Sequence, residues 1–316
     1  MHVEGKNILV TGGAGFIGSH LVDRLIKKKS TVKVIDNYQA GRRENLNQSW
    51  DEIQVIKGDI RNSELVREVI EDVDVIFHIA ANASVPYSVK NPRYDFETNA
   101  LGTFNILEAS INSNVEKIIY ASSAAVYGEP TYTPIDEVHP LNPISPYGTT
   151  KLAGEKLGFT FKEIYGLDFT AIRIFNTYGP RQPRYVIYDF IKKLNKNPDK
   201  LEVLGSGEQV RDYCYISDMV NAFILVAEKG NSVYNAAGGS PISIRELADL
   251  MVSEISPNAK IKYGGKTWKG DINVLTANIT RLKNLGFQPE IDFKTGIKRT
   301  IEWFKGVFEN ENPDSR

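Results

Sequence analysis

The 316-residue chain is predicted to fold as a doubly wound α/β protein, in which helices cover both faces of a parallel sheet. Three observations predict this class. Short β-rich runs alternate with helical patterns through the first two-thirds of the chain. Several of these runs are almost continuously apolar, as in strands that a parallel sheet buries on both faces. A glycine-rich turn joins the first run to the first helical pattern.

The predicted strands of this part are residues 7–11, 32–36, 53–57, 73–80, 117–122 and 169–174. The predicted helices between them are residues 15–28, 63–70, 96–113 and 147–165. After Gly179-Pro180 the pattern is less regular, with helices expected over 185–195 and 218–228 and strands over 201–204 and 233–237. Ser243 and Glu246 have the spacing of a capping box, so a further helix is expected to begin there and to run to about residue 254.

This pattern predicts two interleaved parts. Residues 1–180 form a nucleotide-binding domain, to which residues 208–238 return. Residues 181–207 and 239–316 form a smaller substrate-binding region.

Composition excludes several classes of protein. The chain is 41% hydrophobic and 24% charged, with a net charge of −1, so no charge excess favours nucleic acid or an anionic membrane. Cys214 is the single cysteine, which rules out an internal disulfide. No signal peptide and no apolar stretch of about 20 residues is found, so a cytoplasmic location is expected. No His/Cys/Asp/Glu cluster has metal-ligand spacing.

The turn Thr11-Gly12-Gly13-Ala14-Gly15-Phe16-Ile17-Gly18 follows the first strand and opens the first helix. Glycines there allow backbone N–H groups to approach a pyrophosphate at the helix N-terminus. Asp36 ends the next strand, where a carboxylate binds ribose hydroxyls and repels a 2′-phosphate. The spacing therefore predicts NAD rather than NADP, although Arg42 and Arg43 lie nearby and would weaken that preference. Asp59 either caps the adenine or serves an ordinary turn.

Tyr147 and Lys151 are four residues apart on a predicted helix and therefore share one face. A fixed cation lowers the pKa of a neighbouring phenol and makes the pair a proton-transfer device beside a redox cofactor. His78 lies inside an apolar strand and is interpreted as a core histidine, and Cys214 as inert packing.

Together these segments resemble the extended short-chain dehydrogenase/reductase family, in its nucleotide-sugar epimerase and dehydratase branch. The resemblance runs in order along nearly the whole chain and implies a Rossmann-like fold. The segments that carry it are residues 11–18, 59–60, 78–81, 99, 122–128, 147–151, 173–180, 209–213 and 270–272.

The resemblance implies a role for each matching residue. Tyr147 is the catalytic acid/base, Lys151 holds the nicotinamide ribose and lowers the pKa of Tyr147, and Ser123 bonds the reacting sugar hydroxyl. The residues implied to bind NAD are Gly12, Gly15, Phe16, Ile17, Gly18, Asp36, Asn37, Asp59, Ile60, Ala80, Ala81, Asn99, Ser122, Tyr147 and Lys151. The residues implied to bind substrate are Ser123, Tyr147, Asn176, Tyr178, Arg211, Lys266, Asp271 and Leu275.

The reaction expected from the resemblance is 4-epimerisation of a UDP-sugar through a 4-keto intermediate. Sugar 4,6-dehydratases carry an Asp-Glu pair where this chain has Ala124 and Ala125, and a methyl group transfers no proton. Leu275 falls where glucose/galactose epimerases tend to have a tyrosine, which leaves space for an N-acetyl group. UDP-glucose and UDP-galactose are the expected substrates, with the N-acetylhexosamine pair as a second pair.

Other functions stay open at this stage. The stretch 180–185 is short for the substrate loop of the branch, and Lys266 or Lys269 stands where an arginine is usual. These departures keep UDP-glucuronate 4-epimerase open, along with a nucleotide-sugar decarboxylase or reductase. A non-enzymatic NAD-sensing regulator is the third alternative.

Helices 96–113 and 147–165 are apolar around more than one face, and family members pair these helices in a four-helix interface, so a homodimer is expected.

Overall fold

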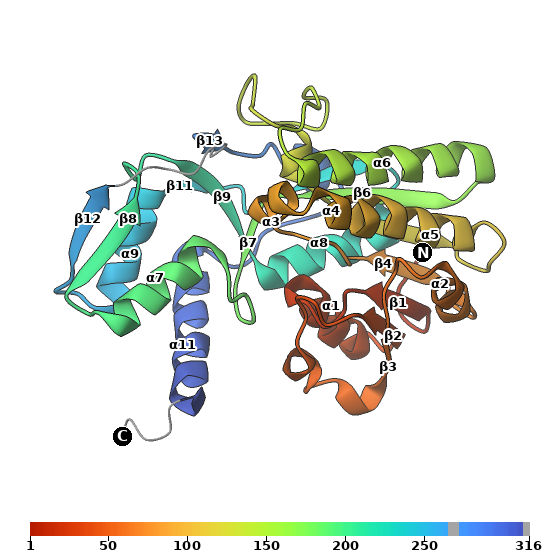
Figure 1. Ribbon diagram of the computed structural model, residues 1–316, viewed down its shortest axis with the longest axis horizontal. Coiled ribbons are helices and arrows are strands. Elements are labelled where there is room, and N and C mark those ends of the chain that lie inside the picture. Colours follow the sequence, from red (N-terminus) through yellow and green to blue (C-terminus); the bar gives the residue numbers. More distant parts are fainter. Residues whose placement is uncertain (265–271, 312–316) are drawn as a thin grey trace.

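A seven-stranded parallel sheet forms the centre of the larger part of the molecule (Figure 1). The computed structural model describes residues 1–264 and 272–311. The strand order is β10-β6-β5-β4-β1-β2-β3, and every neighbouring pair is parallel. The strands are β1 Asn7–Thr11, β2 Thr31–Asp36, β3 Ile53–Lys57, β4 Val75–His78, β5 Lys117–Ser123, β6 Asp168–Ile174 and β10 Val233–Ala236. The predicted doubly wound α/β class is confirmed.

Helices cover both faces of this sheet (Figure 1). The helices α1 Phe16–Lys27 and α8 Ile216–Lys229 pack together on one face. On the other face lie α2 Ser63–Ile70, α5 Gly102–Ser110 and α6 Pro146–Tyr165. Each face has its own hydrophobic cluster, and successive strand residues alternate between the two. This double burial explains why the strands are continuous apolar runs.

The two hydrophobic clusters can be followed in β1. Ile8 and Val10 join the cluster under α1 and α8, whereas Leu9 joins the cluster under α2 and α5. All three side chains are at most 1% exposed. A slip of one residue in this strand would exchange the two sets between the faces.

Two predicted elements differ most from the observed ones, whereas the bounds of the others agree within two residues. Strand β4 ends at His78, before Ala80, because the amides of Ile79 and Ala80 donate to the Thr11 hydroxyl. The helix predicted over 96–113 begins earlier, at Pro92, and is divided into three. It runs as α4 Pro92–Phe96, a π-helical turn Glu97–Leu101 and α5. A preceding helix, α3 Val85–Lys90, was not predicted.

The rest of the described chain forms two smaller sheets, on the side of Figure 1 away from β1–β3. Strand β9 pairs with β7, β11 and β13. Of the segment 208–238, which was predicted to return to the nucleotide-binding domain, β10 joins the large sheet and α8 packs on it. The strands are β7 Asn176–Tyr178, β8 Lys200–Leu204, β9 Val210–Tyr215, β11 Pro241–Ser243, β12 Lys260–Gly264 and β13 Val274–Leu275. The helices are α7 Tyr185–Lys196, α9 Ile244–Ile255, α10 Thr280–Asn284 and α11 Phe293–Glu311.

The predicted capping box is present at the start of α9. The Ser243 hydroxyl accepts from the Glu246 amide at 3.1 Å, and the Glu246 carboxylate accepts from the Ser243 amide at 2.7 Å. None of the helices within residues 1–264 and 272–311 combines the length and apolarity that crossing a bilayer requires.

Candidate active site

The candidate site lies where the order of the large sheet reverses. From β1 the chain builds β2 and β3 on one side and then crosses to β4 on the other. In open α/β sheets, ligands bind at this switch point, outside the carboxyl ends of the strands. The residues there are the glycine turn after β1 and Ala80-Ala81 after β4.

The glycine turn leaves no room for a side chain at Gly12 or Gly18. Gly12 has φ +70°, and a Cβ there would lie 2.8 Å from the Ala80 backbone nitrogen. A Cβ on Gly18 would lie 2.2 Å from the Gly12 carbonyl oxygen. Gly15 is the N-cap of the 12-residue helix α1, and no side chain caps it. The turn therefore offers the uncapped N-terminus of α1, beginning at Phe16-Ile17, to an anion.

Asp36 lies beside this turn at the end of β2 and is 7% exposed. Its carboxylate accepts from the amides of Ala14 at 2.9 Å and Tyr38 at 2.8 Å. Burial raises the pKa of Asp36, and these two hydrogen bonds oppose the rise. A carboxylate has about four lone-pair positions, so acceptor capacity remains for ribose hydroxyls.

Asp59 takes part in a turn, as one of its two interpretations predicted. Arg61 donates to it through the backbone amide and the guanidinium, and Asn37 donates at 2.8 Å. Burial would raise the pKa of Asp59, but these hydrogen bonds outweigh burial and lower it. Ile60, the next residue, is 4% exposed and lies against Gly102. A contact of Asp59 with NAD stays a prediction.

His78 is a core histidine, as predicted. It is 1% exposed, with Nδ1 2.7 Å from the Thr11 hydroxyl and Nε2 2.9 Å from the Thr103 hydroxyl. Burial, helped by the charge of Lys151, lowers the pKa of His78 to about 3. The ring is therefore neutral at physiological pH, and both its nitrogens are used inside the protein.

Ser123 and Tyr147 meet near the carboxyl end of β5. Ser145 is the N-cap of α6, which places the half-buried Tyr147 in its first turn. The Ser123 hydroxyl lies close enough to the Tyr147 phenol to oppose the rise of its pKa, and it accepts a hydrogen bond from the Ala125 amide at 3.2 Å. Ser123 therefore serves both as the cap of a short 3-10 helix, η4 Ala124–Val126, and as the partner of Tyr147.

Lys151 lies one turn farther along α6 and is 3% exposed. Its ammonium donates to the Ala121 carbonyl at 2.7 Å and lies 4.9 Å from the centre of the Tyr120 ring. Burial lowers the pKa of Lys151 to about 7, against the opposing charges of Asp95 and Glu155.

The expected lowering of the Tyr147 pKa by Lys151 is not found. Burial raises the pKa of the phenol, the Ser123 hydroxyl opposes the rise, and nearby Tyr185 and Asp95 add to it. The ammonium is directed to the Ala121 carbonyl and the Tyr120 ring. The i,i+4 spacing placed the two residues on one helix face but did not fix where the ammonium points.

Asn99 belongs to the π-helical turn and is 1% exposed. Its Oδ1 accepts from the Asn82 amide at 2.8 Å, and its Nδ2 donates to the Asn82 carbonyl at 3.2 Å. Nδ2 also lies 3.2 Å from acceptors on Asp95 and Thr150. Asn99 thus holds the segment that follows Ala80-Ala81, and a direct contact with NAD stays a prediction.

Glu155 and Arg173 form a buried ion pair that sequence reasoning missed. Their side chains are 3% and 4% exposed, and two hydrogen bonds of 2.9 Å and 2.7 Å join them. The Ser122 hydroxyl donates to Glu155, and Arg173 donates to the Tyr127 hydroxyl at 2.9 Å. Ser122, predicted to contact NAD, is therefore engaged with Glu155 in the interior.

The predicted substrate residues Asn176, Arg211 and Leu275 lie on three neighbouring strands, β7, β9 and β13. Leu275 pairs directly with Arg211. The Arg211 guanidinium donates to the carbonyls of Val210 at 2.9 Å and Asn273 at 3.3 Å. The Asn176 side-chain oxygen is buried and has no hydrogen-bond partner within the described part of the chain, as a group that awaits a ligand would.

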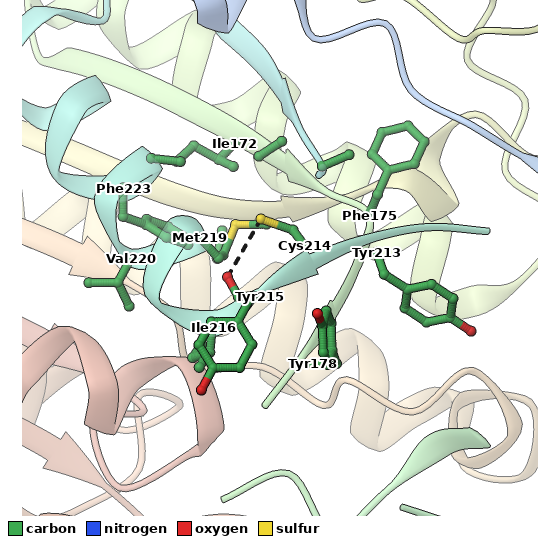
Figure 2. Packing of buried hydrophobic residues seen from close by; sticks show 14 of the residues in the cluster. Ile172, Phe175, Tyr178, Tyr213, Cys214, Tyr215, Ile216, Met219, Val220 and Phe223 are labelled. Atoms are coloured by element: carbon green, nitrogen blue, oxygen red, sulfur yellow. Dashed lines mark hydrogen bonds between the residues drawn. The ribbon is translucent and has the colours of Figure 1, made fainter. Parts of the chain in front are cut away.

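Tyr178 does not lie where a pocket-lining residue was expected. It is 1% exposed, and its ring packs against Tyr213, Tyr215 and Phe293. Its hydroxyl donates to the Phe293 carbonyl at 3.2 Å. Figure 2 shows Tyr178 among these tyrosines, with Cys214 in the same packed cluster. The structure gives Tyr178 a packing role, because its ring and its hydroxyl both contact Phe293 at the start of α11.

Tyr185 is a neighbour of the site that the sequence did not reveal. It begins α7 with φ +68°, an uncommon conformation for a bulky residue. Its hydroxyl donates to the Ala83 carbonyl at 2.9 Å, and its phenol is close enough to raise the pKa of Tyr147. The short stretch 180–185 thereby connects β7 to the segment after β4.

Lys266, Lys269 and Asp271 lie outside the described residues.

Comparison with known proteins agrees with this geometry. Residues 9–300 match the family described as GDP-mannose 4,6 dehydratase. The chain belongs to the extended short-chain dehydrogenase/reductase family. A putative UDP-glucose 4-epimerase of Methanocaldococcus jannaschii is 41% identical over 304 residues, which cover 94% of this chain and 98% of that protein.

Two solved structures of this family are similar over almost their whole length. A UDP-N-acetylglucosamine 4-epimerase from Methanobrevibacter ruminantium, in complex with UDP-N-acetylmuramic acid, is 37% identical with a TM-score of 0.91; the match covers 96% of this chain and 99% of that one. A UDP-glucose 4-epimerase from Thermus thermophilus, in complex with NAD, is 32% identical with a TM-score of 0.88, covering 95% and 99%. The chain is thus a member of a family of nucleotide-sugar 4-epimerases and related NAD-dependent dehydratases.

Proposed function

We propose that this protein is an isomerase that uses bound NAD to interconvert the C4 epimers of a UDP-sugar. The observation that carries the proposal is the placement of Ser123 next to Tyr147, with Lys151 one turn along α6, at the carboxyl end of β5, two strands along the sheet from the β1 strand that leads into the glycine turn. The cradle that a Cβ would fill at Gly12 and the acceptor positions left on Asp36 fit a dinucleotide. The uncapped start of α1 would hold its pyrophosphate.

The chemistry follows from these positions. Bound NAD⁺ would accept a hydride from sugar carbon 4 and later return it. Tyr147 would take the proton of the 4-hydroxyl, while Ser123 orients that hydroxyl and the Lys151 ammonium holds the nicotinamide ribose. After the 4-keto sugar turns its other face, Tyr147 gives the proton back, so the cycle has no net redox change.

The same site favours epimerisation over dehydration. Ala124 and Ala125 form the 3-10 helix after Ser123, where a 4,6-dehydratase carries its second acid–base pair. Ala124 is 3% exposed and supplies no proton donor. The proposal therefore assigns all proton transfer at the sugar to Tyr147.

A panel assay tests the function. The purified protein, without added NAD, is incubated with UDP-glucose, UDP-N-acetylglucosamine and UDP-glucuronate, and the products are followed by NMR. We expect UDP-glucose to give both C4 epimers. If UDP-glucuronate alone is turned over, that sugar is the substrate. If the sugar loses carbon dioxide or water, the reaction is a decarboxylation or a dehydration and not an epimerisation. Retained NAD with no turnover of any sugar would identify a sensing protein.

Substrate size provides a second test. Leu275 is half-buried beside Arg211, so a larger side chain there would narrow the proposed sugar site. We expect Leu275→Tyr to lower kcat/KM for UDP-N-acetylglucosamine by about tenfold or more and to change kcat/KM for UDP-glucose far less. Leu275→Met, which conserves volume, is the control. Unchanged turnover of the N-acetyl sugar by Leu275→Tyr would contradict the size argument.

We further propose a homodimer formed by the helices α4–α5 and α6. Each presents exposed apolar side chains: Phe96 and Leu101 are 58% and 40% exposed, and Ile164 and Tyr165 are 66% and 51% exposed. Light scattering should give twice the mass of one chain. Phe96→Glu combined with Leu101→Glu should give a monomer, whereas Val138→Glu, at a 75% exposed residue outside these helices, should not. A wild-type monomer would refute the interface.

A further inference from the structure

Asp95 is a buried carboxylate that neither the sequence motifs nor the proposed mechanism uses. It lies on α4 and is 0% exposed. It accepts hydrogen bonds from the Asn82 amide group at 2.7 Å, the Thr150 hydroxyl at 2.7 Å and the Asn99 amide group at 3.2 Å. All three donors are neutral. They hold the carboxylate in place but do not neutralise its negative charge.

The three donors come from three segments that border the proposed site. Asn82 follows Ala80-Ala81 at the end of β4, and Asn99 lies in the π-helical turn. Thr150 lies on α6 between Tyr147 and Lys151, and its hydroxyl is also 3.1 Å from the Tyr147 carbonyl. A π-turn inside a helix frequently marks a functional site. Here it brings Asn99 and Asp95 to the same point.

We propose that Asp95 is a positioning residue of the catalytic site: its hydrogen bond to Thr150 fixes the α6 turn that carries Tyr147 and Lys151, and it places a buried negative charge near both side chains. This proposal rests on the function proposed above.

The groups around Lys151 single out Asp95 as the acid that does this. Tyr120 and His78 face Lys151 from β5 and β4, and both are uncharged, since burial raises the pKa of the Tyr120 phenol and lowers that of His78. Glu155 lies on the same helix but is paired with Arg173. Asp95 therefore supplies the unpaired negative charge that opposes the effect of burial on Lys151.

The charge also acts on the phenol. After burial, Ser123, Tyr185 and Asp95 all influence the pKa of Tyr147, and Asp95 raises it. Removing the carboxylate should therefore lower the pKa of both Tyr147 and Lys151. The two pKa values change in the same direction, because a negative charge favours the protonated form of both side chains, the phenol and the ammonium.

The experiment measures how much NAD the protein retains after dialysis across a pH series, together with kcat over the same series. In the wild type, retention is expected to fall as pH rises through the pKa of Lys151, because the neutral amine holds the ribose less well. Asp95→Asn should move this fall, and both limbs of the kcat profile, to lower pH by about one unit. Asp95→Ser removes the same charge in less space and should shift the curves in the same direction.

Glu97→Gln is the matched control. Glu97 is a neighbouring acid whose side chain is 32% exposed and paired with Arg61 and Arg93, so its removal should leave the curves in place. If the Asp95 variants lose turnover equally at every pH and their curve of NAD retention against pH does not move, Asp95 has a structural role alone. That result would overturn the proposal. If the wild type turns over no UDP-sugar, the proposed function fails, while the NAD-retention curves still decide the role of Asp95.

Discussion

Tyr147→Phe is expected to lower epimerisation of the UDP-sugar by about 10²–10⁴-fold, the usual contribution of one acid–base group. The substitution removes only the hydroxyl next to Ser123 and keeps the half-buried ring. The glycine turn and Asp36 are untouched, so NAD should stay bound. The measurement is turnover by NMR, with NAD content determined by absorbance after denaturation.

The matched control removes a phenolic hydroxyl elsewhere. Tyr132 is 44% exposed, and its hydroxyl donates to Asp136 at 2.8 Å in a surface loop. Tyr132→Phe should keep turnover within a few-fold of the wild type. Substantial epimerisation by Tyr147→Phe, with NAD still bound, would remove Tyr147 from the proton-transfer role.

The parts of the structure that could be predicted depend on local chemistry. The glycine turn, the alternation of strands and helices, and the Ser243–Glu246 capping box each follow from residues within one or two turns of chain. His78 was interpreted correctly because a histidine in an apolar run is more often bonded in the core than catalytic.

The parts that were missed depend on topology. Asp95 and Thr150 are 55 residues apart, and Glu155 and Arg173 are 18 apart. No spacing rule joins such pairs, because only the packing of α4 and β6 against α6 does so. Tyr178 shows the same limit: a three-residue strand carries too little pattern to reveal which face it buries. The motif gave Tyr178 a ligand role, whereas the register of β7 against β9 turned the ring inward.

The ion pair between Glu155 and Arg173 predicts the largest effect on stability. Glu155→Ala should lower the free energy of unfolding by about 3–5 kcal/mol, because it leaves a buried guanidinium without its counter-ion. Among the described residues, Arg173 would keep the Tyr127 hydroxyl and the Glu137 carbonyl as acceptors. Ser122 would lose its buried partner, one residue before Ser123. Urea denaturation, followed by circular dichroism, measures the change.

A double substitution separates the charge effect from the loss of packing. Replacing both residues by methionine removes the two buried charges together and fills most of the volume, and it should recover most of the lost stability. This follows because transferring two ions from water to the interior costs about as much as their attraction returns. If the double variant is no more stable than Glu155→Ala, the pair stabilises the fold outright. In that case the contact between α6 and β6, the strand that pairs with β5 up to the proposed catalytic Ser123, depends on the charges themselves.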